Sequence, residues 1–327
     1  MKTDYIKILL SGNDLGKRID VVLSKNLEDI SRSRIQNLIL EGKVSYNNQV
    51  IKNRSLIIKE VGYLEINIPE PLETSIKPQK IKLNILYEDE DLIVINKEAG
   101  LVVHPGSGNL DNTLVNGLVF HCKNSLSGIG GVLRPGIVHR IDKMTSGVMV
   151  IAKNDITHNQ LSKQFKNRTI ERKYVCLTWN NLNLLKGQID KNIKRSKVNR
   201  KKMTICAKNE GKVAITEYEL KERFNFKNLS LCLYECKLQT GRTHQIRVHL
   251  KYKGTSLLGD KQYGKKNIKF KKINNEFFDK LNDLSGQALH AKTLEFIHPK
   301  TKKWMSFNSD LPSSFKKILK LLENLSS

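Results

Sequence analysis

Two short segments hold most of the residues that could do chemistry. The first, Gly136 to Lys153, contains a carboxylate, Asp142, in a polar loop just before an apolar run that begins at Gly147. The small and hydroxyl-bearing residues after Asp142 suit a tight turn that holds a carboxylate at a strand end, and such loops on rigid scaffolds commonly carry function. An aspartate before Thr-Ser-Gly is also a common turn or cap residue. The segment by itself therefore leaves a catalytic and a structural role open.

The second segment, Leu238 to Leu250, concentrates charge at a predicted helix start. Gly241 permits a sharp turn and Thr243 can cap the helix. A helix N-terminus also attracts anions. The polar side chains crowded there are Arg242, His244, Gln245, Arg247 and His249. The two histidines are five residues apart, about 140° around a helix, unlike the i,i+4 pair of a zinc helix. We therefore expect no metal site and a packed His249.

Other familiar chemistries lack their markers. The chain has no P-loop, no G-x-G-x-x-G after a strand, no nucleophile elbow and no zinc deaminase pattern. We expect no cofactor and no metal. The five cysteines form no C-x-x-C pair, which predicts free thiols in a reducing cytosol. No stretch approaches 18 apolar residues, so we expect a cytoplasmic protein without a membrane span.

The elements that must position these residues begin with a small α+β module at residues 14–68. A helix with apolar residues at helical spacing can be capped by Asp29 or Ser31 and is expected to end at Gly42.

A hairpin and a strand complete the module. Val44 to Ile51 predicts the hairpin because Asn47 and Asn48 tolerate the positive φ of its turn. Leu64 to Ile68 alternates as a strand does. The proline-punctuated stretch 69–80 is predicted to be a linker.

From residue 81 to residue 327 strands outnumber helices and no βαβ rhythm repeats. We predict an α+β fold with a mixed, mostly antiparallel sheet. Strands are expected at Leu92–Asn96, Gly147–Ala152, Tyr174–Thr178, Ala214–Leu220 and Leu229–Cys236. Helices are expected at Thr113–Cys122, Thr157–Lys166, Thr243–Lys253 and Ser313–Leu325.

The chain carries a formal net charge of +25, which favours nucleic acid or an anionic membrane surface as a partner. Residues 81–327 hold 44 basic and 22 acidic residues, a net of +22, so the attraction belongs mainly to the larger part. Two basic runs, Lys191–Lys202 and Lys265–Lys272, are expected to be loops, either solvated or in contact with phosphates. A codon bias toward lysine would account for part of this excess.

Several segments together resemble the RluA-type pseudouridine synthases. The similar segments, in the family's order, are HRIDKMTSG (139–147), ERKYV (171–175), LQTGRTHQIRVHL (238–250), GDKQYG (259–264) and LHAKTLEFIHP (289–299). Residues 31–51 resemble an S4 RNA-binding module. VVHPGSGNLDNTLVNGLVFHC (102–122) is most similar to the RluD branch, which modifies large-subunit ribosomal RNA, with the RluC branch next. Met144 departs from the usual acidic residue and Ile141 from the usual leucine.

The resemblance implies conversion of uridine to pseudouridine without a cofactor, with Asp142 as the catalytic carboxylate. It acts either as a nucleophile or as a base that gives a glycal intermediate, and both roles need an ionised group beside a cation. Arg247 is the expected cation, with Arg242 the alternative partner or a phosphate contact. Tyr174 would stack on the flipped uracil.

The resemblance also implies how RNA is held. Arg140 would fill the space that the base leaves or hold the neighbouring phosphate. Arg32 and Arg34 of the S4-like module would contact the RNA backbone. We expect a monomer that binds a ribosomal RNA stem-loop, within or outside a pre-ribosomal particle. Other ribosomal sites or transfer RNA are alternative targets. A ribosome-assembly protein with secondary or lost catalysis is an alternative of another class, disfavoured because Asp142, Tyr174 and Arg247 are all present.

Overall fold

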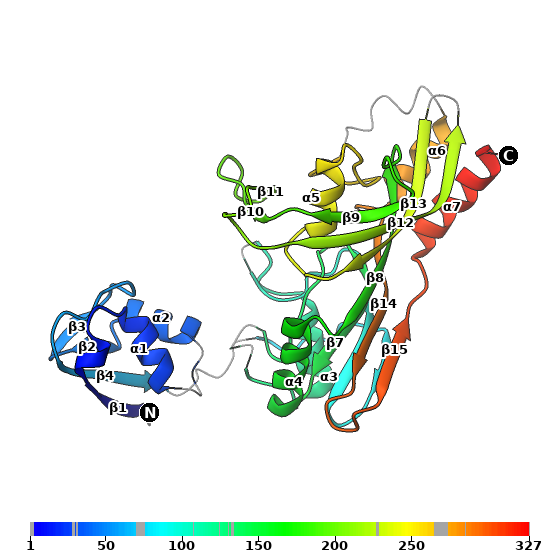
Figure 1. Cartoon of the computed structure of the whole chain (residues 1–327). Coiled ribbons are helices and arrows are strands. Elements are labelled where there is room, and N and C mark those ends of the chain that lie inside the picture. Colours follow the sequence, from blue (N-terminus) through cyan, green and yellow to red (C-terminus); the bar gives the residue numbers. More distant parts are fainter. Residues whose placement is uncertain are drawn as a thin grey trace. The chain divides into compact units, whose positions relative to one another are not determined.

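The computed structural model describes residues 3–27, 30, 32–69, 76–106, 108–123, 125–129, 131, 134–226, 229–264, 274–284 and 286–326. The chain divides into two compact units, Met1–Ser75 and Ile76–Ser327 (Figure 1). Within the described part, no helix combines the length and the apolar character that crossing a membrane requires.

The first unit packs two helices on a small antiparallel sheet, whose described strands have the order β1-β4-β2-β3. Its elements are β1 (Thr3–Leu10), η1 (Gly12–Asp14), α1 (Ile19–Asn26), α2 (Arg32–Leu40), β2 (Val44–Tyr46), β3 (Gln49–Ile51) and β4 (Gly62–Pro69). The predicted hairpin is confirmed, with Asn47 and Asn48 at φ of 46° and 69° in its turn. The predicted helix is α2, which ends before Gly42 at φ 70°. Its candidate caps, Asp29 and Ser31, lie outside the described residues.

The boundaries of the first unit differ at both ends from those expected from the sequence, residues 14–68 for the module and 69–80 for the linker. The strand β1 precedes residue 14 and pairs with β4 along its whole length, from Thr3 opposite Pro69 to Leu10 opposite Gly62. The end of the expected linker, from Ile76 on, belongs to the second unit. There Asn116 Nδ2 donates to the Lys77 carbonyl at 3.0 Å and the Gln79 amide donates to the Asn116 carbonyl at 3.1 Å.

Within the described residues, the second unit is built on one nine-stranded sheet in the order β5-β6-β7-β14-β8-β13-β12-β9, with β15 beside β14. The pair β7–β14 is parallel and the other pairs are antiparallel, which confirms the predicted mixed sheet. The strands are β5 (Ile85–Glu88), β6 (Leu92–Lys97), β7 (Ser146–Ala152), β8 (Glu171–Trp179), β9 (Lys186–Asp190), β12 (Ile215–Phe226), β13 (Leu229–Leu238), β14 (Leu289–Ile297) and β15 (Trp304–Asn308).

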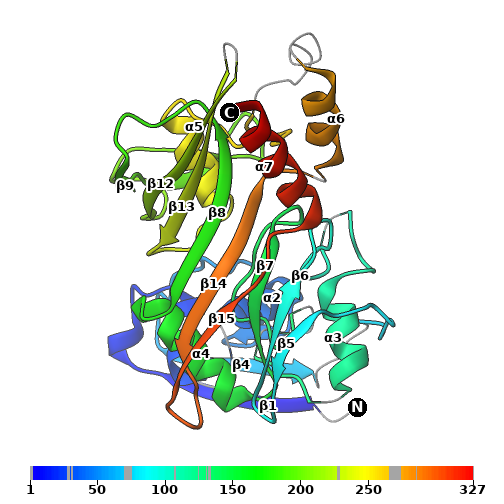
Figure 2. The ribbon, with the colours of Figure 1, turned by 90° about the vertical axis from the view of Figure 1, so that its right-hand side faces the viewer.

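Helices cover both faces of this sheet, so alternate residues of its strands enter different cores (Figure 2). Met149 of β7 packs in the core that contains α3 (Leu114–Cys122) and α5 (Gln245–Tyr252), while Val150 packs in the core that contains α4 (Asp155–Asn167). A third core buries α6 (Asn275–Asp283) and α7 (Ser313–Ser326). Every residue of β7 is buried, as expected of a strand covered on both sides.

The four predicted helices of this unit correspond to α3, α4, α5 and α7, whereas α6 was not predicted. The basic run Lys191–Lys202, expected to be a loop, instead includes strand β10 (Ile193–Arg195) and the turn that leads to β11 (Met203–Ile205). These two strands form a separate hairpin, which we call the basic hairpin (193–205). The whole of the second run, Lys265–Lys272, lies outside the described residues.

Candidate active site

Asp142 lies in the loop that enters β7, and close backbone packing fixes this loop. Gly147 has φ 120°, and a Cβ there would lie 2.2 Å from the carbonyl oxygen of Ala291 on β14. The Thr145 amide donates to the Asp142 carbonyl at 3.0 Å, closing a turn. Gln287 Nε2 donates to Thr145 Oγ1 at 3.0 Å, which ties the turn to the residues before β14. The β7–β14 pair therefore determines where the carboxylate lies.

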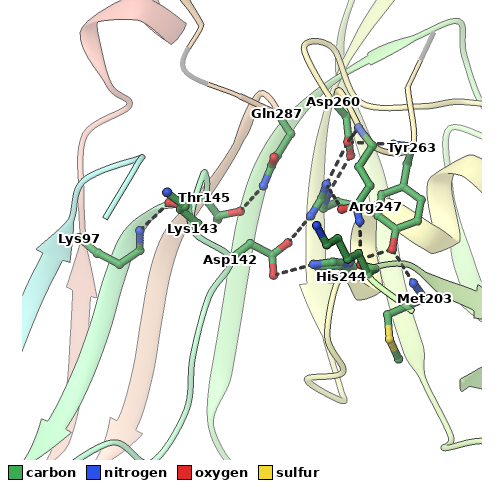
Figure 3. A network of polar contacts seen from close by, with 12 residues as sticks. Lys97, Asp142, Lys143, Thr145, Met203, His244, Arg247, Asp260, Tyr263 and Gln287 are labelled. Carbon is green, nitrogen blue, oxygen red and sulfur yellow. Dashed lines mark hydrogen bonds and ion pairs between the residues drawn. The ribbon is translucent and has the colours of Figure 1, made fainter. Parts of the chain in front are cut away.

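A buried lysine supports the same loop from the other side. The Nζ of Lys97, at the end of β6, donates to the carbonyls of Glu98 and Leu101 at 2.7 and 2.8 Å. It also donates to the Lys143 carbonyl at 3.1 Å (Figure 3). Burial lowers the pKa of Lys97 to about 7, against the attraction of Asp142. Three carbonyl acceptors match the three donors of the ammonium form, so this side chain anchors the backbone immediately after Asp142.

Arg247 of α5 meets the carboxylate directly. Its Nη1 donates to Asp142 Oδ2 at 2.8 Å, while its Nε and Nη2 form a fork on Asp260 at 2.8 and 2.9 Å. Burial would lower the pKa of Arg247, but the hydrogen bonds and charges of Asp260 and Asp142 outweigh it and raise that pKa. The structure thus brings together the predicted pair, with a permanent cation on one oxygen of a carboxylate that is 18% exposed.

Asp260 and Tyr263 are site residues that the sequence did not assign. Asp260 accepts the backbone amides of Gln262 and Tyr263 at 2.9 and 3.0 Å in addition to Arg247, and its side chain is fully buried. The ring of Tyr263 lies 4.9 Å from the Arg247 guanidinium carbon. Both belong to the GDKQYG segment, which gave the only sequence signal. These contacts lock the guanidinium before any substrate arrives.

The Asp142–Arg247 pair opens onto a cavity of about 520 Å³. Tyr174 on β8 forms part of the wall and is 7% exposed, and burial raises the pKa of its hydroxyl. The neighbouring Arg172 donates from Nη2 to the Leu238 carbonyl at 3.2 Å. A Cβ at Gly241 would lie 2.5 Å from Arg172 Nη1, so the glycine leaves room for that guanidinium.

Further arginines named from the sequence line the same cavity. Arg140 donates from Nη1 to His104 Nε2 at 2.8 Å. Arg242, the alternative partner for Asp142, donates from Nε to the Val213 carbonyl at 2.9 Å instead. Arg32 and Arg34 begin α2 of the first unit, and their side chains lie outside the described residues.

His249, expected from the sequence to be packed, is fully buried. His249 has ring contacts to Thr216 Oγ1 at 2.9 Å and to the Lys191 carbonyl at 3.0 Å, as expected of a packed histidine. Among the described residues, the group whose ligand atoms could surround a metal ion is Asp89, Asp91 and His298. His298 Nε2 lies 2.8 Å from Asp89, a contact that holds the β5–β6 turn without requiring an ion.

Comparison with known proteins gives consistent matches. The RNA pseudouridylate synthase model matches residues 91–252, and the S4 domain model matches residues 17–62. A Zymomonas mobilis relative named "Ribosomal large subunit pseudouridine synthase D" is 44% identical and covers 97% of both chains. A Bacillus subtilis relative named "Uncharacterized RNA pseudouridine synthase YlyB" is 41% identical and covers 98% of both. The solved structure of human RNA Pseudouridylate Synthase Domain Containing 4 is 27% identical, with a TM-score of 0.55 over 73% of this chain and 93% of that chain.

The mixed sheet, the S4 domain and these matches define an enzyme that modifies RNA. The chain belongs to the RNA pseudouridylate synthase family. Its members isomerise uridine to pseudouridine.

Proposed function

We propose that this enzyme converts uridines of large-subunit ribosomal RNA to pseudouridine, with Asp142 as the catalytic carboxylate. The observation that carries the site assignment is the 2.8 Å contact between Asp142 Oδ2 and Arg247 Nη1 at a cavity wide enough for a nucleotide. The ribosomal target is supported by the name of the Zymomonas mobilis relative, "Ribosomal large subunit pseudouridine synthase D", which is similar over nearly the whole chain.

The chemistry breaks one bond and makes another within the substrate. The N1–C1′ bond of the uridine breaks, the uracil turns, and a C5–C1′ bond forms while the C5 proton is lost and N1 gains one. Asp142 Oδ1 reacts with the ribose or uracil while Arg247 holds Oδ2. Because no atom enters or leaves overall, the residues of the cavity need only position the base and move protons.

Base extrusion precedes this step, because a stacked uridine does not reach a carboxylate inside a cavity. Tyr174 stacks on the extruded uracil, and stacking of this kind contributes about 1–3 kcal/mol per base. Arg140 and Arg242 hold the space left by the base and an adjacent phosphate. The basic hairpin (193–205) adds phosphate contacts, so affinity falls steeply with added salt.

The two units have different roles in binding RNA. The first unit (Met1–Ser75), which contains the S4-like module, orients RNA through Arg32 and Arg34, while the second unit (Ile76–Ser327) supplies most of the positive charge. We assign the protein to the cytoplasm as a monomer that acts on an RNA stem-loop, within pre-ribosomal particles or on free RNA. Sites other than those of the named relative and transfer RNA are the competing targets.

The test is a map of pseudouridine in ribosomal and transfer RNA from cells with and without this protein. Loss of pseudouridine at large-subunit sites, restored by the wild-type chain, is the expected result. Loss confined to transfer RNA would refute the ribosomal target while leaving the enzyme class intact. An unchanged map in every RNA would refute the proposed activity in these cells.

A further inference from the structure

His244 is a residue of the cavity to which the reaction described above gives no role. It immediately precedes α5 and has φ 56° and ψ 22°, in the left-handed region. A non-glycine residue in this conformation is strained, and such strain gathers at functional sites. Its side chain is 18% exposed and lines the cavity beside Asp142.

A short relay of hydrogen bonds fixes the proton on the His244 ring. The backbone amide of Met203, in the basic hairpin (193–205), donates to Tyr263 Oη at 2.7 Å. Tyr263 Oη lies 2.8 Å from His244 Nδ1 (Figure 3). A phenol has one proton, and donating it to Nδ1 satisfies both groups of this buried contact. The proton of a neutral imidazole is then on Nε2.

Charges around the ring agree with the neutral form. Burial lowers the pKa of His244, and nearby Arg247 and Arg140 lower it further, against Asp142 and Asp260. The ring of His244 therefore presents a single N–H, on Nε2, to the cavity.

This N–H points to the oxygen of Asp142 that Arg247 does not hold. His244 Nε2 lies 3.9 Å from Asp142 Oδ1, whereas Arg247 Nη1 lies 2.8 Å from Oδ2. A separation of 3.9 Å is too long for a direct hydrogen bond. It allows a substrate oxygen to lie within about 3 Å of Nε2 while the adjacent carbon faces Oδ1. His244 is thus placed to contact the substrate next to the reacting atoms.

We propose that His244 is a substrate-contacting residue that donates its Nε2–H to the 2′-hydroxyl oxygen of the target ribose. This rests on the proposed function, in the form in which Asp142 acts at the ribose rather than at the uracil. The 2′-oxygen is bonded to the carbon next to C1′, so it lies beside the atoms that Oδ1 approaches, while the uracil face is assigned to Tyr174. A contact to the 2′-hydroxyl also lets a protein distinguish RNA from DNA at the target nucleotide.

The test is a cycle of protein and substrate changes. The substrate is a synthetic RNA fragment that the wild type converts. Its target nucleotide carries either a 2′-hydroxyl or a 2′-hydrogen. Full-length protein, wild type or His244→Ala, is added in excess over this RNA. Single-turnover rates and RNA affinities are measured. Each single change should slow conversion about tenfold, the usual effect of one hydrogen bond. His244→Ala acting on the 2′-hydrogen substrate should be no slower than either single change. His244→Gln, whose amide can donate from a similar position, should recover part of the rate and part of the preference for the 2′-hydroxyl substrate.

Each outcome decides for or against the contact. Additive losses, with His244→Ala still discriminating tenfold against the 2′-hydrogen, would overturn the proposal. So would a loss coupled instead to a 2-thiouracil base at the target, because His244 would then contact the base. Tyr263→Phe, which removes the hydroxyl that fixes the tautomer, should weaken the 2′ discrimination without lowering RNA affinity. Activity retained by Asp142→Asn is a separate result, because it would refute the proposed role of Asp142 whatever His244 does.

Discussion

Replacing Asp260 with asparagine tests whether the buried ion pair holds the site together. The side chain of Asp260 is fully buried and that of Arg247 is 7% exposed, so solvent screens their contact little. The amide keeps the shape but removes the charge and turns a donor toward Arg247 or the backbone amides of residues 262 and 263. Breaking a buried pair costs about 3–5 kcal/mol, and we take about 3 kcal/mol because Arg247 retains Asp142.

That loss should lower the Tm of the second unit by about 6–12 °C, at about 2–4 °C per kcal/mol for a unit of this size. Tryptophan fluorescence reports this unit selectively, because both tryptophans of the chain, Trp179 and Trp304, belong to it. Asp310→Asn is the matched control, since Asp310 is 84% exposed and pairs with Lys316 at the surface. A Tm for Asp260→Asn as close to wild type as that of the control would refute the reasoning.

The effect should also depend on pH in a defined direction. Burial would raise the pKa of Asp260, but the hydrogen bonds and charge of Arg247 outweigh it and hold that pKa below the usual 3.8. A carboxyl whose pKa is lower in the folded state stabilises the fold above its unfolded pKa, and this stability is lost as the pH falls through the folded value. The Tm gap between wild type and Asp260→Asn should be constant from pH 7 to 5 and narrow below about pH 4. A gap that persists unchanged at pH 3.5 would contradict a charge effect.

Three further changes have expected outcomes. Gly147→Ala should lower the Tm of the second unit strongly, because its Cβ would meet the Ala291 backbone. Gly128→Ala in the same unit, with nothing within 4 Å of the added Cβ, should not, and equal effects would contradict the fixed β7–β14 contact. Lys197→Gln and Lys201→Gln in the basic hairpin should each reduce the slope of log affinity against log salt by about 1, while Lys320→Gln on α7 should leave it unchanged. A chain of residues 76–327 should fold, by circular dichroism and tryptophan fluorescence, yet bind RNA less tightly; failure to fold would contradict two independent units.

The sequence revealed the site through its motifs more than through spacing. Asp142 and Arg247 are 105 residues apart, and nothing local to either predicts their contact, so the pairing followed from the family resemblance. Asp260 lies in the GDKQYG segment (259–264), but its role in holding Arg247 depends on the fold, which brings the two side chains together. The spacing of His244 and His249 argues only against a metal site. The backbone conformation of His244 and its contact with Tyr263, which suggest its role, do not appear in the sequence.

For the fold as well, the sequence predicted the features that depend on neighbouring residues and missed those that depend on residues far apart in the chain. The hairpin at Asn47 and Asn48 was predicted because its turn depends on those two residues. Strand β1 was missed because its partner, β4, is about 60 residues further along the chain. The parallel β7–β14 contact was missed for the same reason, since Ser146 pairs with His290 and only the folded sheet brings them together. Turns can thus be predicted from the residues that form them, while the pairing of strands far apart in the sequence requires the structure.

The most direct test of the central claim uses Asp142→Asn with the intact RNA that the wild-type protein modifies. The substitution keeps the size of the side chain and removes the charge that Arg247 contacts at 2.8 Å. Pseudouridine formation and RNA affinity are measured on the same preparation, with tryptophan fluorescence as the check that the second unit is folded. The account predicts a folded protein that binds the RNA with near wild-type affinity and forms no pseudouridine. A folded Asp142→Asn protein that still forms pseudouridine at the wild-type site would contradict it.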